Sequence, residues 1–497
     1  MLKFNFFQPN VSFGKGMVVG MENNKYVTPL SGRYPSDEMN YLWSNDSKYS
    51  TWRKLWIALA ETEKELGIDI TEEQIEEMKE NVNNIDYDIV AKRERECRHD
   101  VMAHVYEFGL KCPKAKPIIH LGATSCYVTD NTDVILMTKA LELIKQKVIL
   151  VIKNLKEFAL KNKEIVCLGY THFQPAQLTT VGKRATLWLQ DLIEDLEEIE
   201  FVQSHMKLLG CKGTTGTQES FMKLFKDEEK VKQIDMKIAK KMGFENVYAV
   251  SGQTYTRKLD SRVLNLLAQI AQSASKFAND MRLLQHEKEL EEPFEKGQIG
   301  SSAMAYKRNP MRSERINSLS RHVIALVQDT AMTASTQWLE RTLDDSANKR
   351  ICVPESFLAV DSILVLYANI SKDIVVYENV IKTNIMQELP FMATEEILMN
   401  AVLKGGDRQE LHEKIRVYSM ESAKQVKELG KPNDLVQRIA ADKAFGLTEN
   451  EILEAMNPSN LCGRAPNQVV DFIEERVNPV IEKYKNLVEN IKVEVNV

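Results

Sequence analysis

The sequence predicts an all-α protein of three domains, in which the central domain is a bundle of long helices. Glycine (21) and proline (14) together make up about 7% of the 497 residues, against roughly 12% in average globular proteins. A chain with many strands and turns needs more of both residues, so this shortage indicates few, long elements. The middle of the chain also contains long stretches that lack both residues: 123–168, 183–209, 253–292, 311–353 and 355–389.

Apolar residues in the first of these stretches recur at alternating spacings of four and three. They are Met137, Leu141, Ile144, Val148, Val151, Leu155 and Phe158. This spacing places them along one face of a helix. Forty helical residues extend about 60 Å, and a stripe of that length is buried only against similar helices. A bundle is therefore predicted, and we expect it to complete its core by oligomerisation.

Shorter segments lie on both sides of the predicted bundle. Helical patterns before residue 123 cover Trp52–Leu66, Thr71–Asn81 and Ile85–Phe108. Thr71 with Gln74 resembles a capping box at the start of a helix. Beyond Pro390 the breaks come closer together, at Gly405-Gly406, at Gly430 to Pro432, at Gly446 and at Pro458. The predicted domains are an N-terminal short-helix domain (1–124, with a loose extension over 1–30), the central bundle (125–377) and a C-terminal helical domain (378–497).

Charge and cysteine content exclude several classes of protein. The net charge of −6 and the pI of about 5.9 argue against a strongly basic nucleic-acid binder. No stretch approaches 18 uninterrupted apolar residues, so no membrane span or membrane partner is expected. The seven cysteines are odd in number, scattered and never in a CxxC pair, which argues against disulfides and a structural zinc site. Reduced thiols and a cytoplasmic location are the expectation.

The segment with the most unusual composition is the loop 297–310, which reads GQIGSSAMAYKRNP between two long helical patterns. One interpretation is a solvated linker, the usual role of such compositions. The alternative is an active-site loop. Glycines let backbone N–H groups converge on an anion, a serine takes a proton, and a lysine with an asparagine holds a carboxylate.

Four further polar segments are candidates for a site, and each also has an ordinary structural explanation. His172 lies in GYTHFQPAQ (169–177), where a predicted helix ends, and a lone histidine there is more often structural. Arg98-His99-Asp100 reads as a charged helix surface. Thr124 and Ser125 read as the cap of the first long helix, although helix starts also attract carboxylates. The run 341–350, RTLDDSANKR, reads as a salt-bridged surface or as a phosphate contact.

The active-site interpretation is favoured because Gly300 to Pro310 resembles the signature GSSxMPxKxNP of the fumarase/aspartase superfamily. Within that superfamily, the run YKRNPMRSE (306–314) is similar to the adenylosuccinate lyase family. The resemblance extends from about Arg33 to the C-terminus. One position departs from the signature: Ala305 stands where proline is usual. The loss of the fixed φ implies a more mobile loop when the site is empty, at a cost on the order of 1 kcal/mol.

The resemblance implies a role for each candidate residue. Ser301 is the base, and family position alone selects it over Ser302. His172 is the general acid, His99 supports it, and Lys307 stabilises the charge that develops on the substrate. The implied substrate-binding residues are Arg33, Tyr34, Arg98, Asp100, Thr124, Ser125, Thr171, Gln253, Asn309, Arg315, Arg341, Ser346 and Arg350.

The reaction implied is an anti β-elimination of fumarate from an N-linked succinate on a nucleotide. By the same resemblance the substrates are adenylosuccinate (giving AMP) and SAICAR (giving AICAR), with no metal and no organic cofactor. The family forms homotetramers whose sites draw residues from three chains, and we expect the same here. Two alternatives stay open: a sister lyase (argininosuccinate lyase or fumarase), and a helical scaffold without catalytic activity.

Overall fold

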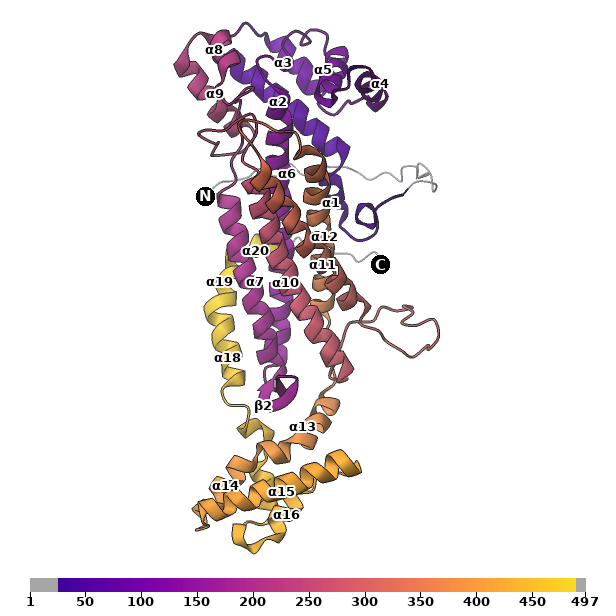
Figure 1. The fold of residues 1–497 in the computed structure, drawn as a ribbon, viewed down its shortest axis with the longest axis vertical. Helices are drawn as coiled ribbons and strands as arrows, with labels where there is room; N and C mark the ends of the chain where they lie inside the picture. Colours follow the sequence, from indigo (N-terminus) through magenta and orange to yellow (C-terminus); the bar gives the residue numbers. More distant parts are fainter. Residues whose placement is uncertain (1–25, 489–497) are drawn as a thin grey trace.

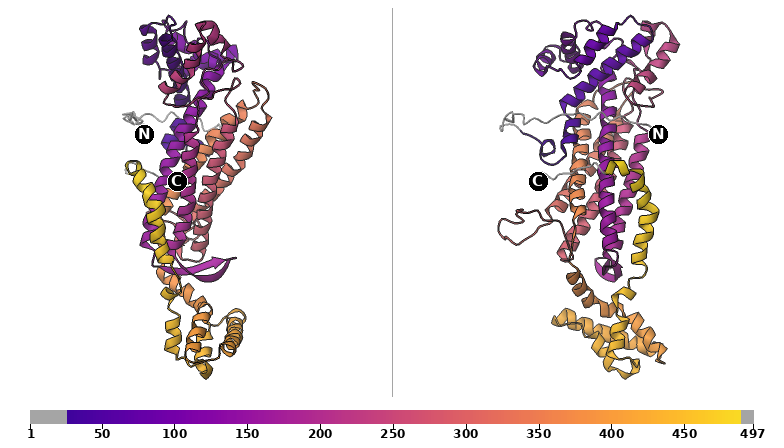
Figure 2. Two further views of the ribbon diagram at one scale, coloured as in Figure 1. Left: turned by 90° about the vertical axis from the view of Figure 1, so that its left-hand side faces the viewer. Right: turned by 180° about the vertical axis from the view of Figure 1, so that it is seen from behind.

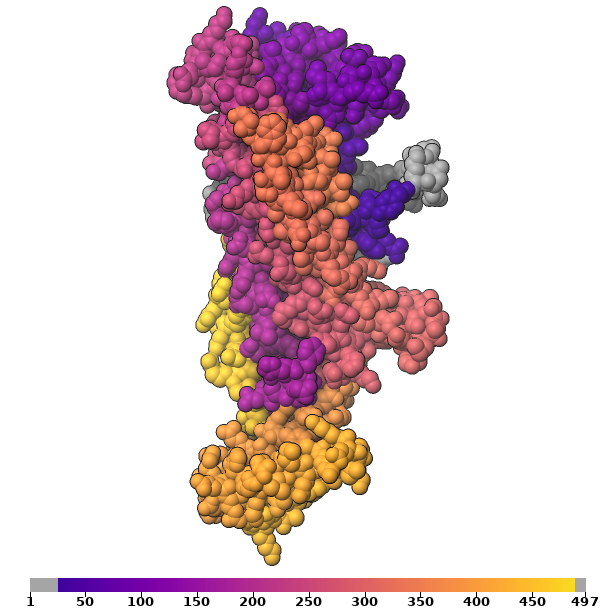
Figure 3. Space-filling model, in the orientation of Figure 1, coloured from indigo at the N-terminus to yellow at the C-terminus, as the bar shows by residue number. Residues whose placement is uncertain are grey.

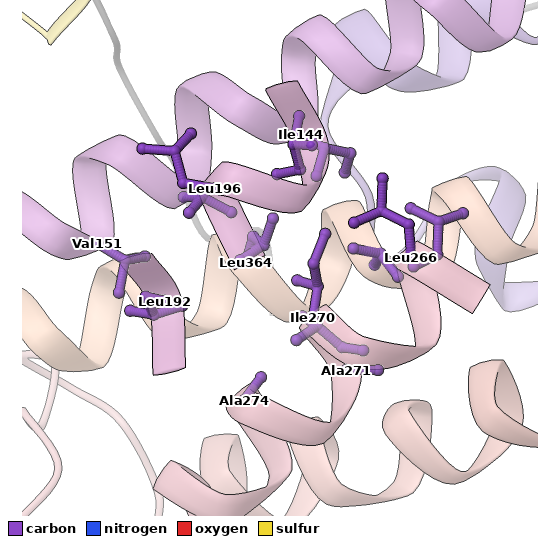
Figure 4. Packing of buried hydrophobic residues seen from close by; sticks show 14 of the residues in the cluster. Ile144, Val151, Leu192, Leu196, Leu266, Ile270, Ala271, Ala274 and Leu364 are labelled. Atoms are coloured by element: carbon purple, nitrogen blue, oxygen red, sulfur yellow. The ribbon is translucent and has the colours of Figure 1, made fainter. Parts of the chain in front are cut away.

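The long axis of the molecule follows a bundle of five helices in the computed structural model, which describes residues 26–488 (Figure 1). These helices are α6 (Ser125–Lys161), α7 (Val181–Ser204), α10 (Lys258–His286), α11 (Met311–Thr336) and α12 (Ser346–Lys372). The apolar stripe predicted along the first of them is confirmed, because every one of its seven residues is buried. Figure 4 shows part of the shared core, with Ile144, Leu196, Ile270 and Leu364 packed against one another.

The predicted all-α class is confirmed, and strands are few in the described part of the chain. The strands form two antiparallel pairs: β1 (Val166–Thr171) with β2 (Gln174–Thr180), and β3 (Leu290–Glu291) with β4 (Val375–Val376). The first pair is a hairpin that projects from the lower end of the bundle (Figure 2).

The prediction of one helical segment over Ile85–Phe108 is wrong, and α12 contains an internal proline. Pro354 lies inside α12 and does not end it. Burial of Val353 and Phe357 on either side of it offsets the roughly 3 kcal/mol that an internal proline costs. The segment Ile85–Phe108 is two helices, since Arg98 adopts a left-handed conformation (φ 56°) that ends the first of them.

Shorter helices cover the upper end of the bundle, and two short elements lie along its side (Figure 1). The 3-10 turn η1 (Pro29–Ser31) and α1 (Asp37–Leu42) lie beside the bundle, where the Ser36 N–H donates to Asp361 of α12. The upper end is covered by α2 (Asn45–Glu65), α3 (Glu72–Glu80), α4 (Tyr87–Cys97), α5 (Asp100–Lys111), α8 (Glu219–Phe225) and α9 (Glu228–Lys241). The predicted capping box of Thr71 and Gln74 begins α3. Helix α9 comes well after α2 in the chain yet packs on it, where Lys237 and Lys241 pair with Glu65 at 3.0 and 2.7 Å.

A second group of short helices forms the lower end. They are α13 (Glu378–Met392), α14 (Thr394–Leu403), α15 (Arg408–Leu429), α16 (Leu435–Ala441), η2 (Lys443–Phe445), α17 (Glu449–Ala455) and η3 (Pro458–Asn460). The chain then returns along the bundle through α18 (Ala465–Phe472), the π-helical η4 (Ile473–Val477), α19 (Asn478–Lys483) and α20 (Lys485–Val488). Arg476 and Lys483 fasten this return to Glu197 and Glu200 of α7.

The domain boundaries at 124 and 377 stay predictions. Most of the predicted loose extension, residues 1–25, lies outside the described residues, and Leu30 near its end is buried. Among the described helices, α12 alone has the length and hydropathy of a membrane span. However, 83% of its most apolar window is buried inside the protein, as expected for the core helix of a bundle.

Candidate active site

The junction of α4 and α5 brings three predicted site residues to the upper end of the bundle. Because Arg98 is left-handed, the chain turns, and His99 becomes the N-cap of α5. The His99 Nδ1 accepts from the Met102 N–H at 3.4 Å, and its Nε2 lies 3.2 Å from the Ser125 Oγ. An imidazole that accepts at Nδ1 carries its proton on Nε2, so His99 donates to Ser125.

The start of α6 lies next to this junction, where Ser125 contacts His99. Helix α6 begins at Ser125, and Thr124 is its N-cap without a side-chain capping bond. Asp100 pairs with Arg350 of α12 at 2.9 Å. Burial raises the pKa of Asp100, but the Val101 N–H and the Arg350 guanidinium together lower it by more. The net shift of the pKa is downward, so Asp100 is ionised at neutral pH.

The remaining residues of this upper group come from the segments that precede α10 and α12. The amide oxygen of Gln253 lies 3.5 Å from the Cys126 Sγ, beside Ser125. The Gln253 N–H donates to the Glu340 carbonyl at 3.0 Å, which places Arg341 in the same group. Ser346 is the first residue of α12. The upper group thus contains nine of the predicted residues: Arg98, His99, Asp100, Thr124, Ser125, Gln253, Arg341, Ser346 and Arg350.

Arg350 is one of the residues that line a cavity of about 180 Å³. Its polar lining includes Lys48, Asp133 and Lys349, which the sequence analysis did not single out. Ligand pockets typically measure about 300–1,000 Å³, so this cavity is too small for a nucleotide. Within residues 26–488, no three His, Cys, Asp or Glu side chains gather as metal ligands would.

His172 lies at the tip of the β1–β2 hairpin, so its predicted place at the end of a helix is wrong. Thr171 pairs with Gln174, which leaves His172 and Phe173 as a two-residue turn. Both have a positive φ (53° and 58°), a conformation that asparagine and glycine usually supply in such turns. Strain of this kind costs about 1–2 kcal/mol per residue and is concentrated at functional sites. The turn leaves His172 exposed at the tip.

Ser301 has two hydrogen-bond donors within its own loop. Its Oγ accepts from the N–H groups of Ala303 at 3.3 Å and Met304 at 3.2 Å. Two N–H donors aimed at one oxygen stabilise negative charge on it, as in an oxyanion hole. In the space-filling view this loop stands out from the body of the molecule (Figure 3).

The base of the loop is closed by close backbone contacts. The Asn309 Nδ2 donates to the Gly300 carbonyl at 2.6 Å. A Cβ at position 300 would lie 2.1 Å from the Lys307 carbonyl oxygen, so only glycine fits there. Lys307 itself is exposed. Arg33, Tyr34 and Arg315 gather at the start of α11, where both guanidinium groups stack on the Tyr34 ring at 5.7 and 5.2 Å.

One chain does not bring these groups together. The upper group lies at one end of the bundle, while the hairpin with Thr171 and His172 lies at the other end (Figures 1 and 2). The loop with Ser301, Lys307 and Asn309 projects sideways below the middle of the molecule (Figure 1). His99 and His172 are therefore far apart within one chain.

Replacing Ala305 by proline should preserve the lyase activity that the resemblance implies and change turnover by no more than about threefold. The Lys307 N–H donates to the Met304 carbonyl at 3.0 Å, so Ala305 is the second residue of a four-residue turn. Proline is favoured there because its fixed φ suits the turn. Steady-state turnover of Ala305→Pro tests this, with Ala303→Pro as the control, since proline there removes an N–H that bonds Ser301. Abolished activity in Ala305→Pro contradicts this description of the loop.

Comparison with known proteins places this fold among the lyases built on a helical bundle. A family model described as "Lyase" matches residues 32–325. The fold is similar to that of 3-carboxy-cis,cis-muconate lactonizing enzyme from Pseudomonas putida (TM-score 0.78, 19% identity, 90% of this chain and 99% of that chain). It is also similar to that of a fumarate lyase from Mesorhizobium sp. BNC1 (TM-score 0.75, 20% identity, 89% and 99%). At these identities the likeness shows the fold alone.

Closer relatives define the family within this class. A second family model, described as "Adenylosuccinate lyase C-terminus", matches residues 390–472. The adenylosuccinate lyase of Saccharomyces cerevisiae is 50% identical over 478 residues, covering 95% of this chain and 99% of the yeast protein. The adenylosuccinate lyase of Schistosoma mansoni is 47% identical over 468 residues, covering 94% and 98%. The chain belongs to the adenylosuccinate lyase family.

Sequence reasoning missed the buried charges behind the upper group. The carboxylate of Asp345 accepts from both Arg341 and Arg257, and the Arg257 guanidinium also donates to Asp130. Asp345 was visible within the run 341–350. Arg257 lies 88 residues before Asp345, and Asp130 lies 127 residues before Arg257, so no local pattern connects these three.

Proposed function

We propose that this protein is a carbon–nitrogen lyase that releases fumarate from adenylosuccinate, giving AMP, and from SAICAR, giving AICAR. The observation that carries the proposal is the environment of Ser301, whose hydroxyl oxygen accepts two backbone N–H groups. The identity of 47–50% to relatives named adenylosuccinate lyase supports the substrate.

Ser301 acts as the base in the proposed mechanism. A proton on the carbon next to a carboxylate is weakly acidic, so its removal requires an ionised serine and a stabilised carbanion. The N–H groups of Ala303 and Met304 support the ionised serine, and Lys307 stabilises the charge that passes to the substrate carboxylate. The C–N bond then breaks, and its electron pair leaves with the nitrogen.

His172 acts as the general acid that protonates the departing nitrogen. Histidine is the side chain used most often to transfer protons near neutral pH, so its imidazole suits this role. The exposed, strained hairpin tip favours this role, because it presents the imidazole away from its own bundle. His99 supports the acid. Ser301 removes the carbon-bound proton from the face of the substrate opposite His172, which gives anti elimination.

The nucleotide is held by the upper group and by the Arg33–Tyr34–Arg315 stack. Arg341, Ser346 and Arg350 suit the phosphate, since guanidinium groups make forked bonds to its oxygens. Thr124 and Ser125 at the start of α6 suit a succinyl carboxylate. The amides of Gln253 and Asn309, with Arg98, Asp100 and Thr171, complete the proposed contacts.

The active enzyme is a homotetramer in which each site takes residues from three chains. The separation of the hairpin, the loop and the upper group within one chain supports this assembly. Large apolar side chains are also exposed along α11 and the segment that follows it: Ile324, Met332, Trp338, Leu339 and Leu343. Apolar surface of this extent marks a protein interface. All seven cysteines are unpaired, which supports a cytoplasmic enzyme with reduced thiols.

A panel of substrates tests the proposed function. The purified protein is expected to turn over adenylosuccinate and SAICAR, followed by absorbance, and to leave argininosuccinate and malate unchanged. A sister lyase has no need of the phosphate contacts at Arg341, Ser346 and Arg350. Turnover of argininosuccinate without adenylosuccinate would therefore assign the protein to the sister enzyme, and no turnover of any substrate would favour a scaffold.

A further inference from the structure

We infer that Asp345 is a positioning residue that fixes Arg341 for the phosphate of the nucleotide. This inference rests on the proposed function, in which Arg341 is one of the phosphate contacts. Asp345 immediately precedes α12 and is fully buried, whereas the Arg341 side chain is 23% exposed. The Asp345 Oδ1 accepts from the Arg341 Nη1 at 2.8 Å.

The geometry of Arg341 leaves part of its guanidinium available to a ligand. Its Nη1 donates to Asp345 and to the Thr342 carbonyl. Within residues 26–488, its Nε and Nη2 have no hydrogen-bond acceptor. A guanidinium held at one nitrogen keeps its plane fixed, while its other N–H groups bind an anion with little loss of side-chain entropy.

Asp345 is itself held by a buried ionic network. Its Oδ2 accepts from the Arg257 Nε at 2.5 Å. The two terminal nitrogens of Arg257 donate to Asp130 at 2.9 and 3.3 Å, and Asp130 also accepts from the Tyr255 N–H at 3.1 Å. Asp130, Arg257 and Asp345 are each at most 3% exposed. This network connects the starts of α6, α10 and α12.

The side chain of Asp345 is committed to these arginines rather than to its own helix. Aspartate before a helix usually accepts from N–H groups of the first turn, yet α12 has no side-chain cap. Burial raises the pKa of Asp345, but Arg257 and Arg341 together lower it by more. The carboxylate is therefore ionised at neutral pH. Its negative charge balances two guanidinium groups that would otherwise repel each other.

The control residue is Asp130, which shares the network but does not contact Arg341. Both Asp345→Asn and Asp130→Asn remove one buried negative charge from the neighbourhood of Arg257, so both are expected to lower the melting temperature. The two variants differ in their expected effect on the phosphate. In Asp345→Asn an amide faces two guanidinium groups, and Arg341 loses its fixed position.

The experiment compares adenylosuccinate with its dephosphorylated nucleoside for the wild type and both variants. Asp345→Asn is expected to lower kcat/KM for the nucleotide by 10- to 100-fold, mainly through KM, and to change kcat/KM for the nucleoside by less than threefold. Asp130→Asn is expected to lower both values by the same factor. An equal loss for both substrates in Asp345→Asn, or an identical loss of phosphate preference in Asp130→Asn, overturns the inference.

Binding measurements separate this inference from the proposed function and from misfolding. Calorimetry with AMP and adenosine measures the phosphate preference without catalysis, so an inactive wild-type protein contradicts the proposed function alone. Where Asp345→Asn does not fold, Asp345→Glu keeps the charge but moves it by one methylene. It is expected to weaken AMP binding at least fivefold and to leave adenosine binding unchanged. Unchanged AMP binding in the folded variant overturns the inference.

Discussion

Mixing Ser301→Ala chains with His172→Ala chains is expected to restore about a quarter of the wild-type activity, although each variant alone is nearly inactive. Each single substitution removes a proton-transfer group and is expected to lower kcat by about 10²–10⁴-fold. The hairpin that carries His172 lies away from the loop that carries Ser301 in one chain (Figures 1 and 2). When the two residues of a site come from different chains, random assembly leaves some sites with both residues intact.

The matched control mixes Ser301→Ala with Lys307→Met chains. Both residues lie in the loop 297–310, so one chain supplies them together and every site in the mixture carries one defect. No restoration is expected. The chains are co-expressed with two different tags, and tetramers that carry both tags are purified before the adenylosuccinate assay. If doubly tagged tetramers of the first mixture stay as inactive as the single variants, the proposal that different chains supply Ser301 and His172 to one site is wrong.

The predictable part of the fold is the part that follows from local burial. The apolar stripe from Met137 to Phe158 is buried over its whole length, since a helix of that length has one face to cover. The β1–β2 hairpin was not predicted, because its turn residues are histidine and phenylalanine rather than asparagine and glycine. Pro354 by itself disfavours a continuous helix, and tertiary packing around it explains why α12 continues.

The candidate site also contains residues that could be predicted from the sequence and residues that could not. Ser301, Lys307 and Asn309 lie within a continuous stretch, so their pattern was readable in the sequence, as was Arg98-His99-Asp100. The ionic network of Asp130, Arg257 and Asp345 joins residues 88 to 127 positions apart. Pairing at this distance depends on how α6, α10 and α12 pack, which residue spacing along one helix does not determine. The junction at Arg98 was also missed, since nothing but its backbone conformation separates α4 from α5.

Replacing Glu63 by glutamine is expected to stabilise the protein at pH 8 by on the order of 3–5 kcal/mol. Glu63 in α2 is fully buried, and neither of its carboxylate oxygens has a hydrogen-bond partner among residues 26–488. Burial raises its pKa from the ordinary 4.5 to about 9. The folded protein therefore keeps this proton at neutral pH, while the unfolded chain has released it. Glutamine has a similar shape and no charge to neutralise.

The pH dependence separates this cause from a simple packing effect. Between pH 4.5 and 9 the folded state binds one more proton at Glu63 than the unfolded state. The free energy of unfolding therefore falls by about 1.4 kcal/mol per pH unit as the pH rises through this window, and only in proteins that retain Glu63. The melting temperature of Glu63→Gln is expected to exceed that of the wild type by several degrees at pH 8 and by little at pH 5. The exposed Glu80 of α3 gives the control, since Glu80→Gln removes a carboxylate that is already hydrated. A gain of equal size at both pH values would show that glutamine improves packing, and that burial of the charge is not the cause.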